Sequence, residues 1–143
     1  MVFENSYCLR CNKCCRNTEM ILLLSDIDRI TDKGFRDFYE LKNGFYVLRN
    51  INGKCVFLDP TGRCIIYEDR PLGCRVYPLI LDEDNGAMLD KYCPLSDFFV
   101  TLKHDLRRGC ELLVQFMDEL SRDYGYSVDI NKLKATCEEL INK

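Results

Sequence analysis

The most regular hydrophobic pattern lies in the C-terminal third of the chain, where apolar residues recur at alternating gaps of three and four. This spacing predicts a long helix over residues 99–124, ended by Gly125, and a shorter helix over residues 130–140. Cys110 and Cys137 belong to these two apolar stripes. Because neither has a proline or a second thiol beside it, we expect both to pack in the core as small hydrophobic residues.

The N-terminal half shows a weaker helical signal. An apolar run over residues 18–24 is consistent with a buried strand or with the lead-in to a helix. Ser25 fits a helix N-cap with Asp28 in the first turn, where a carboxylate faces the positive end of the helix dipole, and Gly34 fits the end of this helix. Residues 35–41 are expected to form a second short helical turn.

Between the two helical regions the pattern changes to β-rich runs separated by turn residues. Two hairpins are predicted, residues 45–51 with 54–58 across Asn52-Gly53, and residues 76–81 with 87–92 across 84–86. An Asn-Gly pair favours a type I′ turn, because both of its residues tolerate positive φ. A further turn over residues 59–62 should bring Cys64 back towards Cys55.

These elements predict one α+β unit, a small cysteine-rich domain with short hairpins and a C-terminal helical pair. We expect a cysteine-cluster region over residues 1–95 and helices over residues 96–143 that pack on it. The composition, with 47% hydrophobic and 30% charged residues in a chain of 143, is that of an ordinary folded protein with a modest core.

Net charge and hydropathy indicate which kinds of partner the protein is expected to bind and in which cellular compartment it is expected to lie. The net charge is −3 and no segment is strongly basic, so binding to nucleic acid is not expected. The longest apolar run, residues 20–24, is far too short to span a membrane, and the first residues lack the basic and apolar regions of a signal peptide. We therefore expect a cytoplasmic protein, in which thiols stay reduced and metal ligation is favoured over a disulfide framework.

Cysteine is the residue type that carries the candidate chemistry. Besides the two helical cysteines, eight lie in predicted loops or at hairpin edges, where backbone can wrap around a metal ion: Cys8, Cys11, Cys14, Cys15, Cys55, Cys64, Cys74 and Cys93. Eight thiolates make two complete tetrathiolate sites, or one cluster with spare thiols. The adjacent Cys14 and Cys15 are expected to project in different directions, and so to serve two centres or to leave one thiol in reserve.

The spacing of these thiols favours an iron–sulfur cluster, of [4Fe–4S] type, with zinc as the alternative cofactor. Structural zinc sites usually take their ligands in close pairs, whereas the four distal cysteines are separated by eight, nine and eighteen residues. Cys8-x2-Cys11-x2-Cys14 with a remote Cys93-Pro94 follows the ferredoxin pattern, in which a distant Cys-Pro completes a thiolate triplet. The single histidine, His104, lies among charged residues and is expected on the surface.

Basic residues flank both groups of cysteines and would compensate the negative charge of a metal–thiolate centre. They are Arg10, Lys13, Arg16, Arg63, Arg70 and Arg75.

Several motifs in this order resemble those of a known family. They are Cys8-x2-Cys11-x2-Cys14-Cys15, Gly53-Lys-Cys55-Val-Phe-Leu58, Cys64-Ile-Ile-Tyr67, Arg70-Pro-Leu-Gly-Cys74-Arg75-Val-Tyr-Pro78 and Cys93-Pro94. Across about residues 8–94 the chain is similar to the YkgJ-like CxxCxxCC family, described as zinc- or iron-chelating proteins. The resemblance implies that the eight cysteines named above are the family cysteines. A domain of this type also occurs in flagellin lysine N-methylases.

These features predict an iron–sulfur accessory protein, with a redox or oxygen-sensing role, that docks on a larger enzyme complex. The alternatives are a structural zinc-binding module and a subunit of a methyltransferase-type enzyme. Methyl transfer from S-adenosylmethionine needs a nucleotide pocket, and the sequence has no glycine-rich strand–turn–helix loop for one. The chain alone is therefore not expected to be an enzyme, and the spacing leaves open whether there is one metal centre or two.

Overall fold

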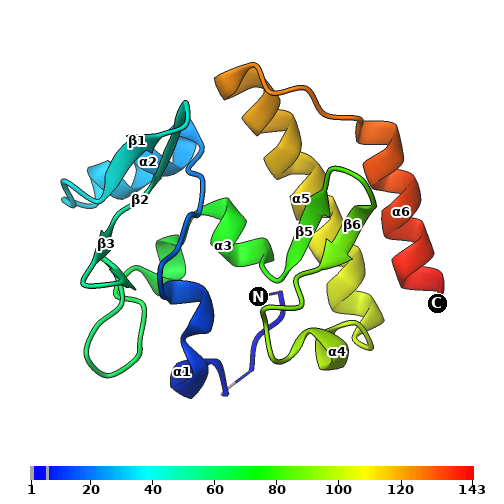
Figure 1. Ribbon diagram of the computed structural model, residues 1–143, viewed down its shortest axis with the longest axis horizontal. Coiled ribbons are helices and arrows are strands. Elements are labelled where there is room, and N and C mark those ends of the chain that lie inside the picture. Colours follow the sequence, from blue (N-terminus) through cyan, green and yellow to red (C-terminus); the bar gives the residue numbers. More distant parts are fainter. Residues whose placement is uncertain (1, 6) are drawn as a thin grey trace. The chain divides into compact units, whose positions relative to one another are not determined.

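The computed structural model describes residues 2–5 and 7–143; Met1 and Ser6, which belong to the predicted cysteine-cluster region, lie outside the described residues. Its elements follow in the order α1 (Cys8–Cys11), η1 (Lys13–Cys15), α2 (Leu24–Asp32), β1 (Tyr39–Lys42), β2 (Phe45–Leu48), β3 (Asn50–Ile51), β4 (Lys54–Cys55), η2 (Tyr67–Asp69), α3 (Leu72–Val76), β5 (Leu79–Asp82), β6 (Gly86–Leu89), α4 (Ser96–Phe99), α5 (Lys103–Tyr124) and α6 (Ile130–Asn142). The described strands form antiparallel pairs, β1–β2, β3–β4 and β5–β6 (Figure 1). The predicted α+β class, with short hairpins and a C-terminal helical pair, is confirmed.

The chain divides into two compact units. Residues 4–74 form the first, here called the thiol unit because it holds seven of the ten cysteines. Residues 1–3 and 75–143 form the second, here called the helical unit. Helix α3 begins in the range of the thiol unit and ends in that of the helical unit.

Two hairpins with Asn-Gly turns build the β part of the thiol unit. Asn52 and Gly53 have positive φ, 54° and 77°, and join β3 to β4, so the predicted turn is confirmed. Asn43 and Gly44, with φ of 53° and 87°, make a second such turn that joins β1 to β2. The predicted helical turn over residues 35–41 is wrong, because β1 begins within this range and pairs with β2.

Helix α2 starts earlier than predicted. Its N-cap is Leu23 rather than Ser25, and Asp26 rather than Asp28 is the third helical residue. The Asp26 carboxylate accepts the Leu23 backbone N–H at 2.9 Å, which satisfies a donor at the helix start. The helix ends shortly before Gly34, whose φ of 100° fits the predicted stop.

The core of the thiol unit is apolar, and cysteines lie at its edge. Its buried members are Leu22, Ile30, Phe38, Leu48, Cys55, Phe57 and Ile66. Phe38 and Phe57 pack with 5.5 Å between their ring centroids. Cys15, Cys64 and Cys74 pack against this cluster, so part of each side chain rests on apolar surface.

In the helical unit the predicted hairpin is confirmed with shorter strands, since β5 pairs antiparallel with β6. The predicted continuous helix over residues 99–124 is wrong at its start, because α4 ends at Phe99 and α5 begins at Lys103. Leu102, with φ −87° and ψ 80°, is not helical and separates the two. Gly125 ends α5 in the left-handed conformation, as predicted. No helix in the described part of the chain is both long and apolar enough to cross a membrane.

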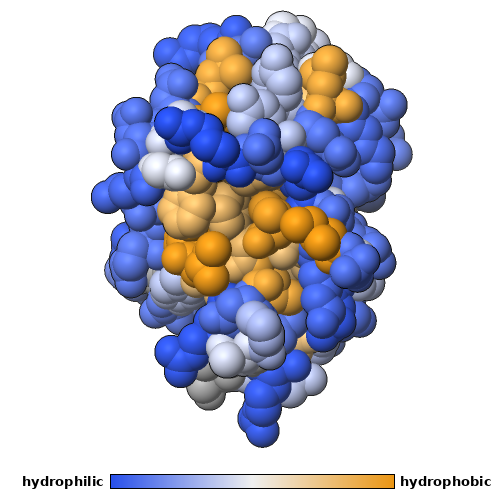
Figure 2. Space-filling view, turned by 90° about the vertical axis from the view of Figure 1, so that its left-hand side faces the viewer, coloured by the Kyte–Doolittle hydropathy of each residue, from blue (hydrophilic) through white to orange (hydrophobic). Residues whose placement is uncertain are grey.

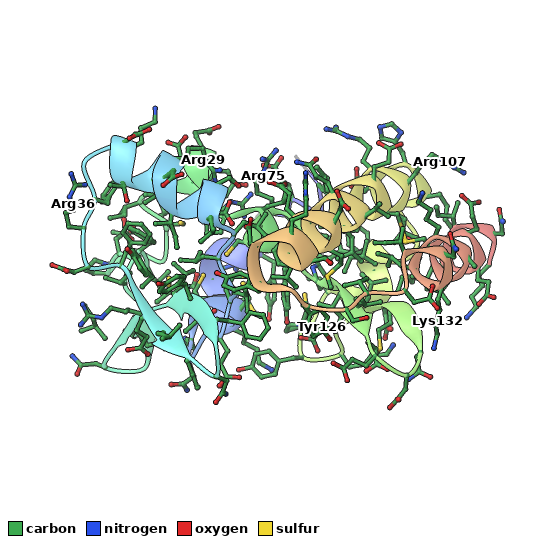
Figure 3. All side chains as sticks on the ribbon, turned by 90° about the horizontal axis from the view of Figure 1, so that it is seen from above. Arg29, Arg36, Arg75, Arg107, Tyr126 and Lys132 are labelled. Carbon is green, nitrogen blue, oxygen red and sulfur yellow. A yellow bond between two sulfur atoms is a disulfide. The ribbon has the colours of Figure 1, made fainter. Side chains whose placement is uncertain are left out.

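Helix α6 is held to the β5–β6 hairpin by polar contacts. The Thr136 hydroxyl accepts a backbone N–H of β6 at 2.9 Å. Lys132 Nζ donates to the Asp84 carbonyl at 2.8 Å, and the Tyr126 hydroxyl donates to the Glu83 carboxylate (Figure 3 labels Lys132 and Tyr126). These contacts fix both ends of the hairpin turn against the segment that carries α6.

A disulfide joins α5 to α6 between Cys110 and Cys137, whose Cα atoms are 6.1 Å apart. Both residues are buried in the apolar stripes of the two helices, as predicted. The same stripes contain the buried residues Leu106, Leu113 and Leu133. The expectation that they remain separate thiols is wrong. The two stripes face each other, and this brings cysteines far apart in the sequence to bonding distance.

Candidate metal centre

The first four cysteines lie on two consecutive short helical turns. Cys8 and Cys11 are the first and last residues of α1, and Cys14 and Cys15 end η1. Asn12 lies between the two turns with a left-handed backbone, at φ 52°, a conformation that asparagine tolerates better than most residues. The local sequence therefore folds the cysteine run into a compact double turn.

A turn stabilised by Asp59 carries Cys64 back towards Cys55. The Asp59 carboxylate accepts the backbone N–H groups of Thr61 and Arg63, each at 2.9 Å. Cys64 then forms an antiparallel bridge with the chain just before the turn. Burial raises the pKa of Cys55, and the charge of Cys64 adds to this effect, so the two thiols are close enough to interact, as predicted.

Five thiols of this unit interact with one another, and we call them the inner thiols. They are Cys14, Cys15, Cys55, Cys64 and Cys74. They come from η1, from β4, from the segment after the Asp59 turn and from α3. Because these segments are far apart in the sequence, it is the fold of the thiol unit that gathers them.

Within the inner thiols, the side chains of Cys14 and Cys15 share a hydrogen bond. Cys15 is the donor: its hydrogen bond lowers the pKa of Cys14, and the same bond raises the pKa of Cys15. The expectation that the two side chains project in different directions is wrong, because the tight turn η1 holds the two sulfur atoms together. The hydrogen bond therefore favours the thiolate form of Cys14, with Cys15 as the thiol that stabilises it.

Burial raises the pKa of the other inner thiols, Cys55, Cys64 and Cys74. Neighbouring cysteines add to the shift, because a second negative charge nearby disfavours the thiolate form. These sulfurs therefore hold their protons at neutral pH unless a cation replaces the proton. A metal ion that binds here must release protons, which makes its affinity dependent on pH.

Arg70 is the basic residue that acts on the inner thiols. Its positive charge lowers the pKa of Cys14, Cys64 and Cys74, against the effect of burial on the last two. The guanidinium lies 4.1 Å from the centroid of the Tyr67 ring, and its Nε donates to the Tyr67 carbonyl at 3.1 Å. Arg70 is one of the six basic residues that flank the cysteines in the sequence, and its contacts with Tyr67 hold it where its charge compensates that of a thiolate.

The remaining predicted site cysteines are Cys8, Cys11 and Cys93. Cys8 and Cys11 are on α1, and Cys93 belongs to the helical unit, where its N–H donates to the Asp90 carbonyl at 3.1 Å. Among the described residues, no three Cys, His, Asp or Glu side chains have an arrangement that could hold a metal ion. His104 is exposed, as predicted.

The chemistry of the inner thiols fits a soft metal ion. Thiolate sulfur is the ligand that zinc and iron–sulfur clusters prefer. Four of the five inner thiols, all except Cys14, lie in or against the apolar core, where a bound metal would replace the protons that burial retains on Cys55, Cys64 and Cys74. Cys14, Cys55, Cys64 and Cys74 are the thiols best placed to act together, since each of them lies within electrostatic range of others in the set.

Two residues that contact the segment carrying Cys74 were not identified from the sequence. Asp26 accepts the backbone N–H of Leu72, and Arg29 donates to the carbonyls of Asp69 and Arg70. The sequence does contain a pattern that could have identified them. An acidic residue in the first turn of a helix, followed three residues later by arginine, favours an ion pair on one helix face.

Comparison with known proteins agrees with this picture of a thiol site. The family pattern that matches residues 7–94 is CxxCxxCC, described as a "putative zinc- or iron-chelating domain". The chain is also similar to an uncharacterized protein of Methanocaldococcus jannaschii, MJ0661, at 30% identity over 95 residues, which covers 60% of this chain and 51% of that protein. The chain thus spans about half the length of this relative. No solved structure matches the chain.

Proposed function

We propose, since the chain belongs to the CxxCxxCC family of zinc- or iron-chelating domains, that its cysteines hold an iron–sulfur cluster of [4Fe–4S] type. The proposed ligands are drawn from Cys8, Cys11, Cys14, Cys15, Cys55, Cys64, Cys74 and Cys93. The observation that carries the proposal is the closeness of five inner thiols from four chain segments, four of which lie in or against one apolar core. A bound cluster would supply one-electron transfer or a response to oxygen.

Two features of the thiol unit favour iron–sulfur over a lone zinc ion. The triplet Cys8-x2-Cys11-x2-Cys14 follows the ferredoxin spacing, whereas structural zinc sites usually take their ligands in close pairs. Arg70 also provides a cation and donors close to the sulfurs, the kind of neighbour that sets the potential of a redox cluster. Zinc remains the alternative cofactor, and it is an outcome of the experiment below.

The proposed role is that of an accessory protein, for redox chemistry or oxygen sensing, which docks on a larger enzyme complex. The thiol unit leaves Leu24, Leu41, Ile51 and Ile65 between 42% and 66% exposed. One face of the molecule shows a patch of hydrophobic residues bordered by hydrophilic ones (Figure 2). Exposed apolar surface of this kind is typical of protein interaction sites.

Expression and purification without oxygen, followed by iron, acid-labile sulfide and zinc analysis, test the cofactor. We expect iron and sulfide together, with broad visible absorption that dithionite bleaches. A colourless protein with zinc alone, even when iron is supplied and oxygen excluded, would identify the structural zinc module instead. Cys110→Ala is the matched control, because it removes a cysteine that takes no part in the proposed site.

The docking role is tested with the double variant Leu41→Ser and Ile65→Ser. Both side chains are exposed, so the variant should keep its fold and metal content. We expect weaker binding to the partner enzyme, first identified by cross-linking in the cells of origin. Unchanged binding would show that Leu41 and Ile65 do not belong to the docking surface.

A further inference from the structure

A buried carboxylate in the thiol unit, that of Asp26, is hydrogen-bonded to the segment that carries Cys74. Asp26 is only 1% exposed. One of its oxygens accepts the Leu23 N–H at 2.9 Å, and the other accepts the Leu72 N–H at 3.1 Å, 46 positions along the chain. The second bond fixes the start of α3, the helix on which Cys74 lies.

Arg29, one helical turn after Asp26, contacts the same segment. Its guanidinium donates to the carbonyls of Asp69, at 3.1 Å, and Arg70, at 2.9 Å, and pairs with Asp26 at 3.1 Å. The ion pair on α2 thus binds three consecutive peptide groups of one segment, through two carbonyls and the Leu72 N–H. We call this segment, residues 69–74, the strap. The strap contains Arg70, the cation of the inner thiols, and leads directly into Cys74.

Stability alone does not explain this arrangement. Burying a carboxylate opposes folding, and burial raises the pKa of Asp26 although its hydrogen bonds and Arg29 act in the opposite sense. Well-packed apolar residues of similar size often stabilise a fold as much as a buried ion pair does. What the ion pair adds is a set of directional bonds, which fix where one backbone segment lies.

We propose that Asp26 and Arg29 are positioning residues that hold the strap of residues 69–74 so that Arg70 and Cys74 meet the other inner thiols; this rests on the proposed metal binding. The pair acts through the backbone and touches no sulfur in the described structure. It therefore sets how readily the thiols close on a metal, and leaves the number of metal ions bound unchanged.

The experiment compares Asp26→Asn, Arg29→Ala and Arg29→Lys with the wild-type chain and with Arg36→Ala. Arg36 is the matched control, because it also donates to two backbone carbonyls, those of Thr31 and Phe35, which lie outside the strap (Figure 3 labels Arg29 and Arg36). Each full-length protein is titrated anaerobically with Co²⁺ alone, and thiolate-to-cobalt charge-transfer bands report ligation. Hydrogen exchange of the strap amides is measured in the same samples before Co²⁺ is added.

We expect Asp26→Asn and Arg29→Ala to weaken Co²⁺ binding by about 10- to 100-fold at unchanged stoichiometry, the usual effect of losing a group that orients ligands. Their strap amides should exchange faster, while Arg29→Lys should recover part of both effects and Arg36→Ala should change neither. The proposal is overturned if Arg29→Ala binds Co²⁺ like wild type, or if Arg36→Ala weakens it equally. A wild-type chain that binds no Co²⁺ would instead overturn the proposed metal site, and with it any role of this pair towards a metal, whatever the exchange rates show.

Discussion

The thiol unit and the helical unit use cysteine in opposite ways. In the thiol unit five cysteines interact with one another near Arg70, on short helical segments and hairpin ends, and four of them lie in or against an apolar core. In the helical unit two cysteines lie inside regular apolar stripes and are joined in a disulfide that links α5 to α6. The first arrangement leaves sulfur available to a cation, and the second removes it from acid–base chemistry altogether.

The difference shows that the element around a cysteine decides its chemistry more than the cysteine itself does. A long helix places a sulfur in a fixed position on one face, where it meets whatever residue the facing helix presents. A turn exposes backbone N–H groups and lets sulfurs from several segments approach one another. The predictions below test this separation between the two units.

The largest expected effect is on metal content. Cys74→Ala removes the inner thiol that α3 contributes, so we expect the metal centre to be lost, as measured by metal analysis of the anaerobically purified protein. Cys137→Ala, which removes a cysteine of the helical unit, should keep a full complement of metal. Metal loss in Cys137→Ala with retention in Cys74→Ala would reverse the roles assigned to the two units.

Metal affinity should rise steeply with pH. Burial raises the pKa of Cys55, Cys64 and Cys74, so each holds a proton that a metal must displace. Each proton that binding releases makes the metal affinity rise about tenfold per pH unit. Because several thiols release protons, competition with a chelator between about pH 6 and pH 8 should show a rise of more than tenfold per pH unit. A slope near zero would mean that these thiols are not ligands.

Without metal, the same shifts act on stability in the opposite direction. A thiol whose pKa is raised in the folded state contributes stability that is complete below its ordinary pKa and is lost as pH rises through the raised value. Metal-free protein should therefore lose stability in alkaline solution through the thiol unit. Hydrogen exchange should show no matching loss in α5 and α6, because the disulfide sulfurs do not titrate.

Breaking the disulfide should weaken the helical unit and leave the metal centre intact. Cys110→Ala opens a link across 27 positions, and in the chain-entropy description this costs about 3.5 kcal/mol of unfolding free energy. The measurement is urea unfolding with hydrogen exchange read out in α5 and α6. The wild-type protein with the disulfide chemically reduced should move towards the variant, and a reduced protein as stable as the oxidised one would contradict the prediction.

The smallest expected effect separates two glycines in hairpin turns. Gly86→Ala should lower the unfolding free energy by about 2 to 3 kcal/mol, because its φ is 81° and a methyl group would meet the Thr136 side chain on α6. Gly44→Ala in the thiol unit has a similar φ, 87°, with open space around it, so about 1 kcal/mol is expected. Thermal unfolding measures both, and equal losses would mean that the contact with α6 is unimportant.

Local patterns in the sequence were sufficient for the C-terminal helices and for some turns. The apolar stripes of α5 and α6 and the stop at Gly125 follow from helical periodicity, and the Asn52-Gly53 turn follows from the preference of this pair for positive φ. The pairing of β2 with β1 could not be found in this way. Residues 45–48 are flanked by an Asn-Gly pair on each side, and the choice between partners is made by packing on the core.

The sequence was sufficient to predict that cysteines make up the candidate site, but only partly how these cysteines lie relative to one another. The closeness of Cys64 to Cys55 follows from the Asp59 turn between them. The hydrogen bond between Cys14 and Cys15 depends on the tight turn η1, which the spacing of cysteines does not reveal. The action of Arg70 on Cys14, Cys64 and Cys74 depends on long-range packing, which brings these side chains together. The Cys110–Cys137 disulfide was missed for the same reason, since spacing along the chain does not say which stripes face each other.

The order of the inner thiols along the chain has a consequence for how the protein is made. Cys14 and Cys15 leave the ribosome first, and Cys74, with the strap that Asp26 and Arg29 hold, leaves it on the order of several seconds later at ordinary rates of synthesis. During that interval the early cysteines are exposed without their partners, open to oxidants and to unselective metals. A cell that makes this protein would need to guard the nascent chain, or to deliver the metal after synthesis has passed α3.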